Sequence, residues 1–186
     1  MILPIFIYNH PVLRSKCADL KKGDKNLNEL INNMFETMYN ANGVGLAAPQ
    51  IGLSLNLFII DLSPFLNDYP DLKTTKKIFI NPKIVVKNGK DWEFNEGCLS
   101  IPEIREDIIR KEKIKIQYMN QNFAQIEEEI DGIESRVIQH ECDHLKGILF
   151  IDLLSGLRKN VLNRKLKNII KGKFEQNYPF QLFNKK

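Results

Sequence analysis

One short segment, His140-Glu141-Cys142-Asp143-His144, most constrains what this chain can fold into. Two histidines four residues apart lie on one face of a helix, one turn apart, and a glutamate stands beside the first. Two imidazoles that converge on one point can bind a divalent metal ion, and a nearby carboxylate can act on a water held there. The alternative is a polar helix face that carries two histidines. Because the chain has only 3 histidines, we favour the metal-binding helix.

Length, charge and cysteine content restrict the class of protein. A chain of 186 residues, 43% hydrophobic and 27% charged, is typical of one globular domain. The net charge of 27 − 23 = +4 is too small to indicate nucleic acid by itself, and the apolar segment at residues 1–7 is too short to span a bilayer. The 3 cysteines cannot form a paired disulfide framework. We therefore expect a cytoplasmic protein without a membrane or DNA partner.

Apolar periodicity predicts helices at residues 26–41, 131–147 and 155–171. In the last of these, the predicted buried residues are Leu157, Val161, Leu162, Leu166, Ile169 and Ile170. Strands are expected at 56–60, 78–80, 83–87 and 125–130, with a hairpin turn at Asn88-Gly89 leading into 92–94. We expect a single domain over residues 1–186, with a tail at 173–186 that is either mobile or laid across the body.

A glycine-rich segment, residues 43–52, can be approached closely by other backbone or by a ligand. It lacks the Gly-Lys-Ser/Thr ending of a phosphate-binding loop. Gln50 is the polar side chain in this otherwise apolar run. Either Gln50 is a hydrogen-bonded residue of a tight turn, or its amide is a donor aimed at a substrate; the segment alone does not decide between them.

A second candidate ligand occurs in Glu96-Gly97-Cys98-Leu99-Ser100. A cysteine next to glycine at the end of a strand can present its thiolate to a metal ion, although a lone cysteine is more often a packed thiol. Cys142, which is two residues from each histidine of the first segment, points away from their common face. It is not predicted to be a ligand.

Together, segments 43–52, 96–100 and 139–147 resemble the three motifs of bacterial peptide deformylases, in the same order and context. The resemblance extends over nearly the whole chain. It implies an α+β fold in which antiparallel β-sheets surround a central metal-binding helix, with an N-terminal and a C-terminal helix. It also implies one divalent metal ion on Cys98, His140 and His144, with a fourth position open to water. Fe²⁺ is the metal expected first, with Zn²⁺, Ni²⁺ or Co²⁺ as alternatives.

The implied reaction is hydrolysis of the N-formyl group from formyl-methionyl nascent peptides, with release of formate. By resemblance, Glu141 would be the general base, and the Gln50 amide with the Leu99 N–H would stabilise the oxyanion. Gly45 would pair with the peptide backbone. As a hypothesis, the apolar pocket for the methionine side chain would include Ile133 and Val137.

The final helix carries a basic face that has two interpretations. It consists of Arg158, Lys159, Arg164, Lys165, Lys167 and Lys171. The family's final helix is associated with ribosome docking, so the resemblance implies this partner; an ordinary solvated face is the alternative. For the whole chain, two rival functions are an H-E-x-x-H metallopeptidase and a catalytically silent, metal-stabilised binding protein. No histidine follows His144 to complete a peptidase site, and a silent site would need neither Glu141 nor Gln50.

Overall fold

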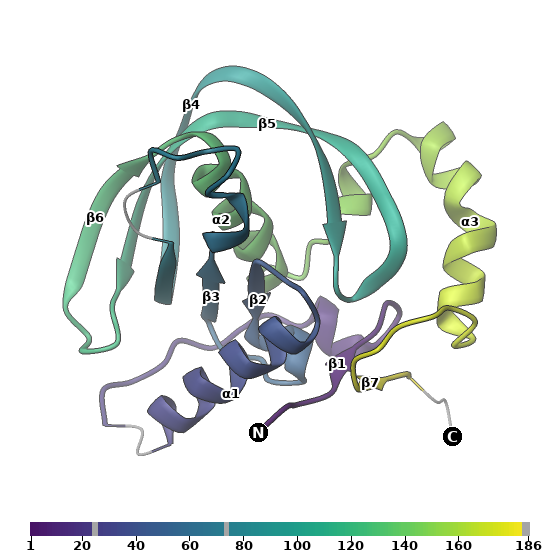
Figure 1. Cartoon of the computed structure of the whole chain (residues 1–186), viewed down its shortest axis with the longest axis horizontal. Coiled ribbons are helices and arrows are strands. Elements are labelled where there is room, and N and C mark those ends of the chain that lie inside the picture. The colour runs from purple at the N-terminus through teal and green to yellow at the C-terminus, as the bar shows by residue number, and fades with distance from the viewer. Residues whose placement is uncertain (24–25, 73–74, 184–186) are drawn as a thin grey trace.

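A strongly bent antiparallel sheet surrounds a central helix (Figure 1). The computed structural model describes residues 1–23, 26–72 and 75–183. The central helix is α2 (Gly132–Leu145). The sheet has the strand order β2-β3-β4-β5-β6, and each neighbouring pair is antiparallel. Its strands are β2 (Gly45–Ala47), β3 (Leu57–Asp61), β4 (Lys76–Cys98), β5 (Ile101–Met119) and β6 (Gln125–Ile130).

Two further helices flank this centre. Helix α1 (Leu27–Asn40) packs its apolar stripe against β2 and β3, and α3 (Gly156–Ile170) lies at the far end of the molecule. Within the described ranges, four short 3-10 helices connect the elements, at Pro11–Arg14, Ala48–Ile51, Ser63–Phe65 and Phe150–Leu153. The arrangement is the predicted α+β fold, with antiparallel strands around the helix that carries His140 and His144. Among the described residues, no helix has the length and apolar character needed to cross a membrane.

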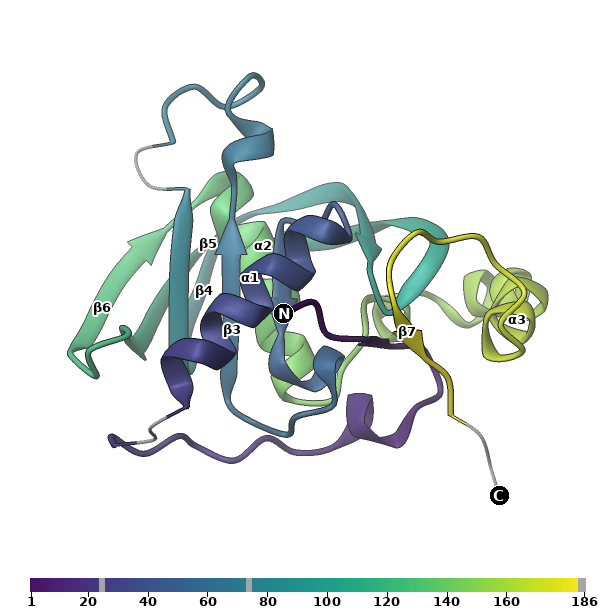
Figure 2. The same ribbon diagram turned by 60° about the horizontal axis from the view of Figure 1, so that its bottom comes forward.

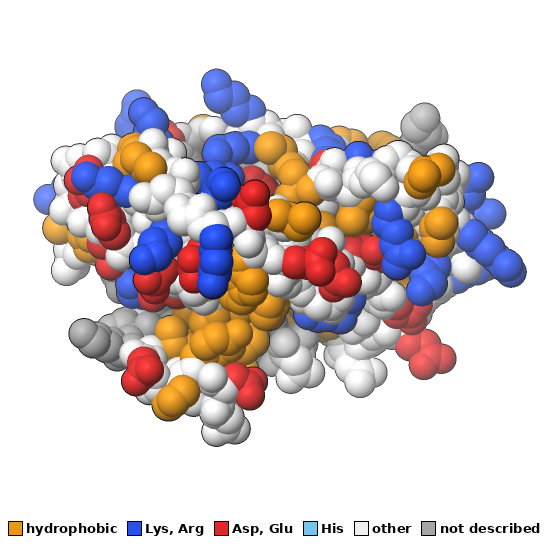
Figure 3. Space-filling view, turned by 90° about the horizontal axis from the view of Figure 1, so that it is seen from above, with side chains coloured by type: hydrophobic (Ala, Val, Ile, Leu, Met, Phe, Trp, Pro, Cys, Tyr) orange, Lys and Arg blue, Asp and Glu red, His pale blue; other side chains and the backbone are white. Residues whose placement is uncertain are grey.

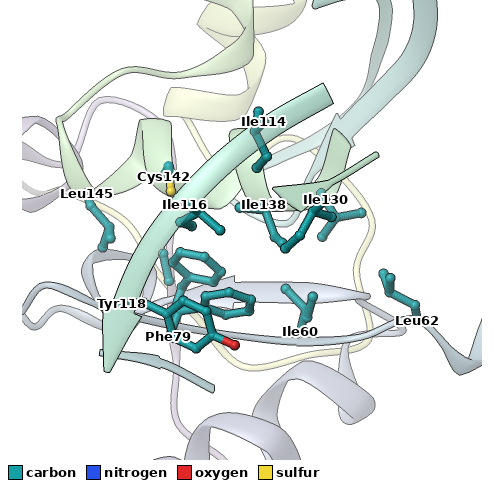
Figure 4. Close-up of a cluster of buried hydrophobic side chains, with 13 residues drawn as sticks. Ile60, Leu62, Phe79, Ile114, Ile116, Tyr118, Ile130, Ile138, Cys142 and Leu145 are labelled. Atoms are coloured by element: carbon teal, nitrogen blue, oxygen red, sulfur yellow. The ribbon is translucent and has the colours of Figure 1, made fainter. Parts of the chain in front are cut away.

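The back of α2 is anchored in the main hydrophobic core (Figure 4). Ile138, Cys142 and Leu145 pack there against the inner faces of β3 to β6. Phe58 and Phe79 stack at the centre of this core, with ring centroids 4.5 Å apart. Because one side of α2 is buried in this way, its other side is held in a fixed orientation toward the functional site.

The hairpin turn predicted at Asn88-Gly89 is wrong. Strand β4 runs straight through it: Asn88 pairs with Lys113 of β5, and the register shifts before the next pair at Asp91. Gly89 has a φ of 78°, so the turn-forming dipeptide makes a bulge within a long strand. The chain reverses instead at Leu99-Ser100, between the paired residues Cys98 and Ile101.

The buried face predicted for the final helix is partly wrong. Leu162 and Ile169 are buried, but Leu157 is 82% exposed and Val161 is 66% exposed. At 100° per residue, these two lie on a separate stripe, rotated by more than a quarter turn from the line through Leu162 and Ile169. Helix α3 is docked on one narrow stripe only, so part of its apolar surface faces solvent.

A strand near the start of the chain lies beside one in the C-terminal tail (Figure 1), and Figure 2 shows the tail crossing from α3 to this pair. Strand β1 (Ile5–Phe6) pairs in parallel with β7 (Phe180–Gln181), which belongs to the C-terminal tail. Tyr178 of the tail is buried, and it forms a small cluster with Ile5 and Ala41. The last part of the predicted tail, 184–186, lies outside the described residues.

Candidate active site

Cys98, His140 and His144 converge on one point although they come from two elements. Cys98 is the last residue of β4, and the two histidines are on α2. One ligand atom from each lies within 4.8 Å of the others, and Cys98 Sγ is 3.2 Å from His144 Nε2. A tetrahedral ion bound at about 2.0–2.3 Å would hold its ligand atoms about 3.3–3.8 Å apart. The three residues therefore fit a metal ion, and three ligands leave one position for a reactant.

A buried charge network orients His140. Glu96 Oε2 lies 3.0 Å from His140 Nδ1, which leaves Nε2 to face the metal position. Arg110 donates to Glu96 at 2.7 and 3.0 Å and to Asp143 at 2.6 Å, and Arg136 donates to Glu96 at 2.9 Å. Burial alone would raise the pKa of Glu96, but the hydrogen bonds with His140 and Arg110 hold it well below its usual value. Glu96 is therefore an anion that fixes the imidazole.

Glu141 is buried beside the triad and faces the same cavity. Burial raises the pKa of its carboxyl to about 7, which suits a group that accepts and returns a proton near neutral pH. Its Oε2 has no hydrogen-bond partner among the described residues. Gly45 leaves room for it: a Cβ at Gly45 would lie 2.8 Å from Glu141 Cδ.

Gln50 is held at both ends of its amide. Its Oε1 accepts from Ala47 N at 2.9 Å, and its Nε2 lies 3.3 Å from Ser100 Oγ and 3.5 Å from Cys98 Sγ. The amide is therefore directed at the turn that contains Leu99. Both readings of Gln50 left open by the sequence have a basis here, since the side chain is hydrogen-bonded and also lines the cavity.

The site opens into a cavity of about 510 Å³. Gly45, Gln50, Leu99 and Glu141 all line it, and so does Val137 one helical turn before Glu141. Among the described residues, Ile133 is not part of this lining: it is buried one turn further along α2. The structure thus brings together at one cavity every predicted site residue except Ile133 and His144, and His144 lies beneath it in the triad.

Known proteins share both the sequence and the fold. Residues 2–160 match the family model of polypeptide deformylase. A peptide deformylase of Christiangramia forsetii is 49% identical, over 100% of this chain and 98% of that protein. One of Flavobacterium johnsoniae is 51% identical, over 96% of this chain and 94% of that protein. The crystal structure of a peptide deformylase from Legionella pneumophila has a TM-score of 0.81 at 37% identity, covering 95% of this chain and 100% of that one.

The chain belongs to the peptide deformylase family. The resemblance predicted from the three motifs is confirmed, and the deformylase is a hydrolase that removes the formyl group from nascent polypeptides. Neither rival, the H-E-x-x-H metallopeptidase or the silent binding protein, agrees with this membership. The family is metal-dependent, and the triad of the deformylase is a possible site for the ion.

Sequence reasoning missed the deformylase's charge network. Arg110 and Arg136 had no assigned role, yet both are buried and both bind Glu96. One signal was available: Arg110 follows Ile104 and Ile108 at even-numbered positions of β5, on the same inward face. An arginine at a core-facing strand position needs a buried acid as its partner. Tyr178, which lines the cavity from the tail, carried no comparable signal.

Proposed function

We propose that Cys98, His140 and His144 hold the catalytic metal ion of this deformylase, with Glu141 as its general base. The observation that carries the proposal is the convergence of the three ligand atoms within 4.8 Å, beside a buried carboxyl that faces the same cavity. Fe²⁺ is proposed first, with Zn²⁺, Ni²⁺ or Co²⁺ as alternatives, because one thiolate and two imidazoles suit these ions. When bound, such an ion polarises the formyl oxygen and lowers the pKa of a water in the open position.

The side chains of the site then divide the reaction between them. Glu141 takes the proton of the attacking water and delivers it to the leaving amine of the peptide. The Gln50 amide and the Leu99 N–H donate to the oxyanion that develops on the formyl group. Gly45, at the start of β2, pairs with the backbone of the formyl-methionyl peptide. Val137 forms part of the wall for the methionine side chain, and Ile133 supports it from one turn away.

We also propose that the ribosome is a partner, met through the basic side of α3. Figure 3 shows Lys and Arg side chains gathered over the end of the molecule formed by α3, with hydrophobic side chains between them. Arg164, Lys165, Lys167 and Lys171 form no ion pair within the described ranges. Unpaired cations on one helix suit a phosphate backbone. We place the reaction in the cytoplasm, where nascent chains emerge, and assign it to one catalytic domain over residues 1–186.

The decisive experiment measures formate released from formyl-Met-Ala-Ser by protein prepared anaerobically with Fe²⁺. Glu141→Ala is the control, and bound metal is quantified in both proteins. We expect release by wild type and a loss of at least about 10²-fold in the variant, with metal retained. Full activity in metal-loaded Glu141→Ala would refute the role of the base. Silence of both proteins with metal bound would refute the proposed site chemistry.

A further inference from the structure

The C-terminal tail reaches the deformylase cavity. After α3 ends, the chain returns toward β1, and Gln176 and Tyr178 line the cavity together with residues of α2, β2 and β4. The tail is held in place on both sides of Tyr178. Glu175 N donates to Glu103 Oε1 at 2.9 Å, and Ile5 N donates to Pro179 O at 2.9 Å. It is thus a fixed wall of the site.

Tyr178 makes a specific contact with the turn between β4 and β5. Its hydroxyl donates to Leu99 O at 2.7 Å. The ring is packed against Ile5 and Ala41, with Leu99 beside them. Only 7% of Tyr178 is exposed, and burial together with the charge of Cys98 raises the pKa of its hydroxyl. The group is therefore a protonated donor at neutral pH, in a place where few waters can replace it.

This turn needs contacts from outside to hold its shape. It has only two residues, Leu99 and Ser100, between the paired Cys98 and Ile101, and neither has the positive φ that the favoured two-residue hairpin turns require. Tyr8 N donates to Ser100 O at 2.8 Å, and Gln50 Nε2 lies 3.3 Å from Ser100 Oγ. These two contacts fix Ser100. The carbonyl of Leu99 is fixed by Tyr178.

We propose that Tyr178 is a positioning residue of the deformylase, which holds the Leu99 turn so that its N–H is aimed at the developing oxyanion. The inference rests on the role of Leu99 proposed above. A preorganised donor stabilises a transition state because it does not reorient during the reaction. If the Leu99 carbonyl loses its partner, the turn samples other orientations, and the donor is misaligned for part of the time. Ground-state binding of the peptide depends much less on this alignment, so the effect falls on kcat.

The test compares Tyr178→Phe with Tyr118→Phe in the metal-loaded enzyme. Tyr118 is a matched control: it is also 7% exposed, and its hydroxyl donates to Glu128, which does not line the cavity. We expect Tyr178→Phe to lower kcat about 3- to 10-fold, the equivalent of one lost hydrogen bond, with KM within about twofold. Tyr118→Phe should leave both constants within about twofold of wild type.

A second readout does not depend on turnover. Hydrogen exchange followed by mass spectrometry on the peptide spanning residues 96–102 should be faster in Tyr178→Phe and unchanged in Tyr118→Phe. Unchanged kcat in Tyr178→Phe would overturn the inference, whatever the exchange shows, and so would an equal loss of kcat in both variants. If wild type itself releases no formate, the proposed function fails. If wild type is active and Tyr178→Phe has the same kcat, only the inference about Tyr178 fails.

Discussion

At the scale of single residues, Gly45 is the position where one added methyl group would do most harm to the chemistry. A Cβ there would overlap the Glu141 carboxyl, with 2.8 Å to Cδ. Gly45→Ala should therefore displace Glu141, the proposed general base, without touching Cys98 or the histidines. We expect kcat to fall about 10-fold or more, since a small misplacement of a catalytic group is costly. Steady-state kinetics with metal content measured in parallel check this; normal kcat with full metal would show that Glu141 can move aside.

Glu96 offers a second test at this scale, directed at the metal. Glu96→Gln removes the charge that orients His140, and loss of such a partner typically lowers metal affinity about 10- to 100-fold. Glu106→Gln is the matched control. Glu106 is 6% exposed and Glu96 is 5% exposed, but Glu106 pairs with Arg158 of α3 and not with a proposed metal ligand. Competition for Zn²⁺ against a chromophoric chelator measures the metal affinity of both variants. Equal affinities in the two variants would contradict the orienting role of Glu96.

At the scale of elements, the end of α2 depends on Gly147. Its φ is 71°, its N–H donates to His144 O, and a Cβ would lie 2.8 Å from the Arg14 carbonyl oxygen. Gly147→Ala should destabilise the protein by about 1–3 kcal/mol, from backbone strain and this clash. Gly156→Ala at the start of α3 meets nothing within 4 Å and should be neutral or slightly stabilising. Urea unfolding of both variants measures these changes in stability. Equal unfolding midpoints would refute the constraint at Gly147.

Apolar periodicity in the sequence predicted the positions of the helices. Helices α1, α2 and α3 were found within a residue or two of their bounds, because apolar periodicity is a property of the local sequence. The same pattern failed for Leu157 and Val161, because periodicity does not show how much of a stripe finds a partner. The dipeptide Asn88-Gly89 predicted a turn, but cross-strand pairing with β5 outweighed the local preference.

The site was predictable to the extent that its residues are close in sequence or belong to compact motifs. The spacing of His140 and His144 is a property of one helix, so geometry followed from it directly. The contacts of Arg110 with Asp143 and of Tyr178 with Leu99 join residues 33 and 79 positions apart. Such contacts depend on the packing of whole elements, which no short segment specifies.

At the scale of the whole molecule, the charge of the deformylase is unevenly distributed. The net charge is only +4, yet six basic residues lie on α3 or directly after it: Arg158, Lys159, Arg164, Lys165, Lys167 and, as the C-cap, Lys171. Arg158 is engaged with Glu106, and Lys159 Nζ donates to Asp152 O at 2.7 Å. The four that follow are exposed, and they lie on α3 or at its C-terminal end, far from the core around α2. A local field of this kind attracts an anionic surface even when the total charge is small.

The ribosome proposal therefore predicts an effect of position and not of total charge. Arg164→Glu with Lys167→Glu lowers the net charge by 4, from +4 to 0, and Lys21→Glu with Lys22→Glu lowers it by the same amount before α1. We expect only the α3 pair to weaken co-sedimentation with ribosomes, by about 10-fold at moderate salt, because it removes two phosphate contacts. The salt dependence of binding should fall as well. Turnover of formyl-Met-Ala-Ser should survive in both, since neither pair lines the cavity. An equal loss of co-sedimentation in both would indicate net charge alone, and no loss in the α3 pair would remove the ribosome from this surface.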